Sequence, residues 1–120
     1  MVKKVLVVDD SPTELRLVTS ALNGKGYNII TASDGVEAIQ KVMKERPDLI
    51  VLDVVMPVKD GFQVCRELKK SPDTKEIKIV MLTSKNQETD RFWGMKQGAD
   101  VYITKPFKEK ELADCVAGLI

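Results

Sequence analysis

Short apolar runs alternate with longer amphipathic stretches five times along the chain. Three of the runs are almost continuous Val, Ile and Leu, which is typical of parallel strands covered on both faces. The second run is shorter and more polar, which suits a strand at the edge of a sheet. The pattern predicts strands over residues 4–8, 27–31, 49–52, 77–82 and 101–103.

Helical patterns fill the stretches between these strands and the C-terminal segment. Ser11 and Glu14 have the spacing of a capping box, Pro12 stands at the first helical position, and Gly24 ends the first helix. The second helix begins near Asp34, and a weaker fourth helix is expected over residues 87–97. The positions expected to face inward are Leu15, Val18 and Leu22 in the first helix, Val36, Ile39 and Met43 in the second, Phe62, Cys65 and Leu68 in the third, and Leu112, Val116 and Leu119 in the last.

This alternation predicts a single α/β domain over residues 1–120, without linkers or internal repeats. Right-handed crossovers favour a doubly wound five-stranded parallel sheet, a flavodoxin-like (βα)5 fold with strand order 2-1-3-4-5. Ligands of such sheets bind outside the carboxyl ends of the strands, where the strand order reverses. Functional residues are therefore expected at that edge.

The charge balance argues against two classes of partner. Lys and Arg number 19 and Asp and Glu number 18, so the net charge of +1 creates no field that attracts nucleic acid or an anionic membrane. No apolar run approaches the roughly 20 residues that a membrane span needs. We expect the partners to be proteins, and the chain to be a monomer or a weak dimer.

The chain contains no histidine, which excludes a Ser/His or Cys/His nucleophile pair, an imidazole metal site and a phosphohistidine. Cys65 and Cys115 lack any metal-binding or redox spacing. They are interpreted as free thiols of a protein in the reducing cytoplasm.

Polar residues follow the predicted strands at their carboxyl ends: Asp9 and Asp10, Asp53, Thr83, and Lys105. Three converging carboxylates repel one another unless a cation lies between them. Hard oxygen ligands together with a phosphate favour Mg²⁺. Lys105 offers positive charge, and the Thr83 hydroxyl a hydrogen-bond donor, to phosphoryl oxygens.

Asp53 stands alone on the middle strand and is the candidate nucleophile, which would form an aspartyl phosphate. The backbone carbonyl of Val55 is expected to be a further metal ligand. Taken alone, each motif has an ordinary explanation as an acidic helix start, a helix cap, a turn or a strand end. Their occurrence together at one edge of the sheet favours a site.

Four segments resemble the signatures of response-regulator receiver domains, and the similarity extends over the whole chain. The segments are Asp9-Asp10-Ser11, residues 53–61 (Asp-Val-Val-Met-Pro-Val-Lys-Asp-Gly), Leu82-Thr83-Ser84 and Lys105-Pro106-Phe107. The resemblance implies that Asp53 accepts a phosphoryl group from a histidine kinase. It also implies Mg²⁺ at Asp9, Asp10, Asp53 and the Val55 carbonyl, with Thr83 and Lys105 contacting the phosphoryl group.

The same resemblance implies that Tyr102 is an aromatic switch coupled to Thr83, and that the Lys105–Pro106 peptide is cis. We expect phosphorylation to move Tyr102 from an exposed to a buried position. A downstream protein would then bind the face formed by the fourth helix, fifth strand and fifth helix, with Arg91, Met95 and Tyr102 on it. Self-hydrolysis of the aspartyl phosphate is expected to be slow.

Two further stretches resemble the small regulators of type IV pilus twitching motility. They are residues 11–14 (Ser-Pro-Thr-Glu) and residues 87–99, which contain Trp93-Gly94. Motility or a chemotaxis-like pathway is therefore the expected process. The sequence leaves open whether the output is binding to a target or service as a phosphate sink.

Three other functions share parts of this pattern. A haloacid-dehalogenase-type phosphatase would carry its nucleophile on the first strand, two residues before a second Asp, and Asp9-Asp10 lacks that spacing. A flavodoxin-type carrier would need a first loop that binds phosphate, which Asp9 and Asp10 would repel. A scaffold that binds its partners regardless of phosphate is the third alternative, and unchanged partner affinity after phosphorylation would favour it.

Overall fold

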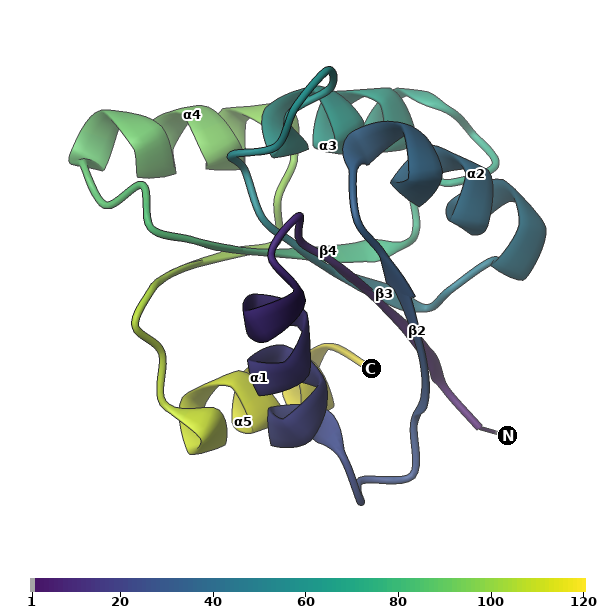
Figure 1. Cartoon of the computed structure of the whole chain (residues 1–120). Coiled ribbons are helices and arrows are strands. Elements are labelled where there is room, and N and C mark those ends of the chain that lie inside the picture. The colour runs from purple at the N-terminus through teal and green to yellow at the C-terminus, as the bar shows by residue number, and fades with distance from the viewer. Residues whose placement is uncertain (1) are drawn as a thin grey trace.

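A computed structural model describes residues 2–120 as five strands and five helices in strict alternation (Figure 1). The elements are β1 (Lys4–Val8), α1 (Pro12–Leu22), β2 (Asn28–Ala32), α2 (Gly35–Glu45), β3 (Leu49–Leu52), α3 (Gly61–Lys70), β4 (Lys78–Thr83), α4 (Glu88–Gln97), β5 (Val101–Thr104) and α5 (Glu109–Leu119).

The strands form one parallel sheet in the order β2-β1-β3-β4-β5, which confirms the predicted doubly wound topology. Helices α1 and α5 cover one face, and α2, α3 and α4 cover the other (Figure 1). Because side chains alternate along a strand, each strand contributes to two cores. In β1, for example, Leu6 and Val8 face α2 and α3, whereas Val5 and Val7 face α1 and α5.

The predicted strands are confirmed with shifts of one residue at some ends. The second and fourth strands begin and end one residue later than expected, and β5 includes Thr104. Strand β2 lies at the edge of the sheet, as its polarity indicated. The weakly predicted α4 does form, although Gly94 lies within it.

The predicted inward face of α2 was wrong at two positions. Val36 is 43% exposed and Met43 is 48% exposed, whereas Ala38 and Val42 are fully buried. A β-carbon on Gly35 would overlap the carbonyl oxygen of the loop residue Lys59. This close approach turns the small residues of α2 toward the sheet and places the larger ones outside.

Among residues 2–120, no helix is long and apolar enough to cross a membrane. Cys65 and Cys115 are both free thiols, and Cys65 is completely buried in the core beneath α3.

Candidate functional site

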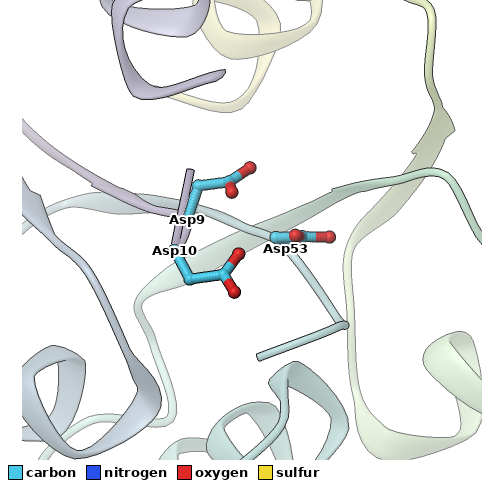
Figure 2. A group of neighbouring side chains, drawn as sticks. All are labelled: Asp9, Asp10 and Asp53. Atoms are coloured by element: carbon cyan, nitrogen blue, oxygen red, sulfur yellow. The ribbon is translucent and has the colours of Figure 1, made fainter. Parts of the chain in front are cut away.

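Three aspartates meet where β1 and β3 end. Asp9 and Asp10 directly follow β1, Asp53 directly follows β3, and one carboxylate oxygen of each lies within 4.8 Å of the others (Figure 2). Asp9 and Asp53 are buried, whereas Asp10 is exposed. The adjacent pairing of β1 with β3 creates this convergence, as the sequence predicted.

Lys105 brings the nearest positive charge to these aspartates. Its Nζ atom lies 2.8 Å from Asp9 Oδ2 and 3.9 Å from Asp53 Oδ2. Burial alone would lower the pKa of the Lys105 ammonium, but the hydrogen bond to Asp9 and the charge of Asp53 outweigh that effect and raise it. Lys105 is therefore a permanently charged group that reaches the acidic cluster.

Asp53 lies in a setting that disfavours its charged form. Its burial, with repulsion from Asp9, raises the pKa of the carboxyl above the ordinary value of 3.8. Three contacts oppose this shift without cancelling it: the charge of Lys105, the hydroxyl of Thr83 and the backbone N–H of Val54, which donates a 2.7 Å hydrogen bond to Asp53 Oδ1. An added cation would relieve the remaining cost.

Thr83 ends β4 fully buried beside Asp53. Its Oγ1 accepts a 3.3 Å hydrogen bond from the backbone N–H of Lys85. Its hydroxyl also favours the charged form of the Asp53 carboxyl and so opposes the rise in the pKa of that group. Thr83, Asp53 and Lys105 therefore line one space, in the arrangement that the strand order predicted.

Tyr102 lies in the buried position of the two that are expected for it. It is only 3% exposed, and its hydroxyl donates a 2.8 Å hydrogen bond to the carbonyl oxygen of Lys85. Arg91 holds it from outside, with its guanidinium 5.3 Å from the ring centroid and Nη1 2.8 Å from the Tyr102 carbonyl oxygen. The ring therefore occupies the inner of the two positions expected for the switch.

The predicted partner-face residues do lie near one another on α4 and β5. Arg91 contacts Tyr102, and Met95, one turn further along α4, is 45% exposed. Phe92 and Trp93 of the same helix are 64% and 47% exposed. The outer surface of α4 therefore carries apolar side chains beside a basic one.

Glu14 belongs to the site, although sequence reasoning assigned it to helix capping. Half of the predicted capping box forms, because the Glu14 backbone N–H donates to Ser11 Oγ. The Ser11 N–H donates instead to Asp9 Oδ1 at 3.0 Å, and Glu14 Oε1 lies 3.2 Å from Lys105 Nζ. Nothing in the spacing of residues 11–14 could have revealed this contact with Lys105, which follows β5.

Beside the carboxylates, an open groove of about 660 Å³ lies between α1 and the start of α5. Its lining includes Glu14, Leu17, Lys105 and Phe107. The Lys105–Pro106 peptide is cis, as expected, and turns the chain there from β5 toward α5. The groove leaves the Lys105 end of the site accessible from solution.

The residues present suit a small divalent cation. Three carboxylates could act as its ligands. Hard oxygen ligands of this kind favour Mg²⁺ over softer metals. Lys105 offers a single positive charge against the three carboxylates, so the cluster has room for a further cation.

Comparison with known proteins gives consistent results over nearly the whole chain. A family model described as the response regulator receiver domain matches residues 5–117. PilH of Pseudomonas aeruginosa is 38% identical over 117 residues, which cover 98% of this chain and 97% of PilH. The alkaline phosphatase synthesis transcriptional regulatory protein PhoP of Bacillus subtilis is 47% identical over 112 residues, but the chain spans only 46% of PhoP.

Solved structures agree in fold. The chemotaxis protein CheY4 of Vibrio cholerae is 34% identical, with a TM-score of 0.92 over the full length of both chains. The phosphorylated cyanobacterial phytochrome response regulator RcpA is also 34% identical, with a TM-score of 0.85 over 99% of this chain and 91% of RcpA.

Proposed function

The chain belongs to the response regulator receiver domain family, whose members signal through phosphorylation, and we propose that its phosphoryl acceptor is Asp53. The observation that carries the assignment is the position of Asp53 between Asp9 and Asp10 on one side and Lys105 and Thr83 on the other. A nucleophile of this kind needs neighbours that absorb the negative charge of the transferred group.

In the proposed reaction a carboxylate oxygen of Asp53 forms a bond to phosphorus, while the bond from phosphorus to the donor nitrogen of a kinase histidine breaks. Lys105 then balances charge on one phosphoryl oxygen, and the Thr83 hydroxyl donates a hydrogen bond to another. The backbone N–H of Val54 orients the attacking carboxylate through its hydrogen bond to Oδ1. The free electron pair on the donor nitrogen takes up a proton from solvent.

Mg²⁺ is the cofactor that we propose for this site, because the acidic cluster offers carboxylate oxygens and little compensating positive charge. Asp9, Asp10 and Asp53 would hold the ion, with the Val55 carbonyl as a further ligand. When bound, the ion neutralises charge on the transferred phosphoryl group.

A receiver domain receives its phosphoryl group from a histidine kinase and passes the signal to a downstream target. PilH matches 98% of this chain at 38% identity, so we assign the protein to motility or chemotaxis-like control. The proposed target-binding face contains Arg91 and Met95, with Tyr102 beneath them, and binds a protein, not nucleic acid or a membrane. The net charge of +1 supports that choice.

We propose that Thr83 and Tyr102 form the switch, with the hydroxyl of Tyr102 anchored on Lys85, two residues after Thr83. Tyr102 is buried in the structure, and phosphorylation would stabilise this inner position against an outward one. One charge-assisted hydrogen bond from Thr83 limits the shift in population to about 5- to 150-fold. Equal target affinity of phosphorylated parent and phosphorylated Thr83→Ala would contradict this coupling.

Slow self-hydrolysis of the phosphoryl group is also proposed. The side chain of Val55, two residues after Asp53, is aliphatic and cannot orient an attacking water. Lys85 Nζ lies 3.7 Å from Asp90 Oδ1, so its charge is directed toward α4. A Val55→Asn variant that keeps its phosphoryl group as long as the parent would contradict the role of Val55.

We also propose that residues 1–120 form a single receiver domain and that the protein is a monomer or a weak dimer. The two free thiols support a location in the reducing cytoplasm. Turnover of a generic phosphomonoester would favour a phosphatase instead.

The test is phosphotransfer from candidate histidine kinases to the parent and to Asp53→Asn. The cognate kinase should label the parent fastest and should leave the variant unlabelled. Labelling of Asp53→Asn at the rate of the parent would contradict the assignment of Asp53 as the phosphoryl acceptor.

A further inference from the structure

The Lys105 ammonium lies near carboxylates from three parts of the chain. Its Nζ atom lies 2.8 Å from Asp9 Oδ2 after β1, 3.2 Å from Glu14 Oε1 on α1, and 3.9 Å from Asp53 Oδ2 after β3. The first two distances are those of direct contacts, whereas the third is too long for a hydrogen bond. In this arrangement the ammonium is held toward Asp9 and Glu14 and away from Asp53.

The Glu14 carboxylate is not needed to cap α1. The cap uses Ser11 Oγ and the backbone N–H of Glu14, which any residue at position 14 supplies. Helix α3 shows the complete motif for comparison, because the Gln63 side chain accepts from the Asp60 N–H while the Asp60 side chain accepts from the Gln63 N–H. In α1 the corresponding carboxylate is directed to Lys105 instead.

We propose that Glu14 is a positioning residue that restrains Lys105 and thereby slows phosphorylation of Asp53. The proposal rests on the function assigned to Asp53 and Lys105 above. A phosphoryl group arriving at Asp53 must draw the Lys105 ammonium toward its own oxygens. Glu14 is neither the proposed acceptor nor a proposed cation ligand, so its contact with Lys105 competes with the phosphoryl oxygens for that ammonium.

The size of the restraint follows from its exposure. The side chain of Glu14 is 28% exposed and that of Lys105 is 13% exposed, so solvent weakens the pair. Partly exposed ion pairs change equilibria by about two- to fivefold. We therefore expect Glu14→Gln to be phosphorylated about two to five times faster than the parent at low ionic strength.

The experiment measures the rate of phosphorylation by acetyl phosphate at saturating Mg²⁺, using intact-protein mass spectrometry. The matched control is Glu45→Gln, because Glu45 Oε1 lies 3.1 Å from Lys4 Nζ with a side chain 30% exposed, away from the site. The control should react like the parent. The gain of Glu14→Gln should diminish as salt screens the ion pair.

Two further variants separate a restraint on Lys105 from simple charge repulsion. Glu14→Asp keeps the charge but shortens the side chain, so it should react faster like Glu14→Gln. In a Lys105→Gln background, Glu14→Gln should give no gain, since the group that it releases is absent. An equal gain in both backgrounds would overturn the proposal.

A Glu14→Gln rate equal to that of the parent would also overturn it, provided that the parent is labelled on Asp53. If the Asp53→Asn protein is labelled as well, the function assigned to Asp53 has failed, and the two failures are distinguishable.

Discussion

Gly94 of α4 lies directly against the buried ring of Tyr102: a β-carbon built on Gly94 would lie 2.8 Å from Cδ2 of that ring. The same atom would lie 2.9 Å from the sulfur of Met81 on β4. The missing side chain therefore makes the space that the ring occupies. The inner position of the proposed switch depends on a glycine in a helix, where glycine is otherwise unfavourable by about 1 kcal/mol.

Replacing Gly94 with Ala should push the Tyr102 ring outward or strain its packing. The clash should cost about 1 to 3 kcal/mol and exceed the gain in helix propensity, so the free energy of unfolding should decrease. Urea unfolding measures the change, and fluorescence of the neighbouring Trp93 reports any movement of the face.

Gly118 of α5 is the matched control, because a β-carbon there would contact nothing within 4 Å. Gly118→Ala should raise the free energy of unfolding by up to about 1 kcal/mol. Equal stabilisation by both substitutions would contradict the contact between Gly94 and Tyr102.

Burial of Asp53 gives the stability of the protein a specific dependence on pH. Its raised pKa means that the folded protein binds this proton more tightly than the unfolded chain does. Its contribution to stability is therefore present below the unfolded value of 3.8 and is lost as pH rises through the raised folded-state pKa. Without Mg²⁺, Asp53→Asn should be more stable than the parent at neutral pH, and the difference should shrink as the solution is acidified.

Thermal unfolding of the two proteins across this pH range checks the prediction, with the exposed Asp73→Asn as the control. A stability difference that stays constant between neutral and acidic pH would show that the Asp53 carboxyl is not penalised by burial.

Asp10 is the exposed member of the acidic cluster and should be needed for the cation but not for the fold. At a Mg²⁺ concentration of about 100 times its dissociation constant, the parent should gain about 2.7 kcal/mol in the free energy of unfolding. Asp10→Ala should gain nothing, whereas the surface variant Asp114→Asn should respond like the parent. If Asp10→Ala titrates with Mg²⁺ as the parent does, the proposed ligand set is wrong.

Val58 is strained in the loop that follows Asp53. Its φ of 67° lies in the left-handed region, which a β-branched residue rarely adopts, and its side chain is 91% exposed. Val58→Gly should relieve this strain and raise the free energy of unfolding by about 1 kcal/mol, whereas Val58→Ala keeps the β-carbon and should gain less. Denaturant unfolding of the three proteins would show the order, and a Gly variant less stable than the Ala variant would refute the assignment of strain.

The sequence predicted the sheet and the meeting of Asp9, Asp10, Asp53, Thr83 and Lys105 for one physical reason. Continuous apolar runs identify buried parallel strands, and the ends of such strands must share one edge. Once the strands are recognised, the residues that follow them are placed together without further information.

What the sequence did not reveal depends on contacts between distant elements. From the sequence, the Glu14 carboxylate could complete the cap of α1 or pair with Lys105. The folded position of β5, which Lys105 follows, determines that it pairs with Lys105. Tyr102 is buried because Gly94 lies opposite it, and α2 presents Ala38 because its start approaches Lys59 closely. Periodicity within a helix cannot specify these choices, since each is set by the surface that the helix meets.

The most direct test of the central claim is the mass of the protein after incubation with acetyl phosphate and Mg²⁺. The parent should gain the mass of one phosphoryl group, removal of Mg²⁺ should prevent the gain, and Asp53→Asn should show none. Asp60→Asn should be labelled like the parent, because Asp60 caps α3 and Asn can replace it there. A phosphoryl group found on Asp53→Asn would contradict the assignment of Asp53 as the acceptor.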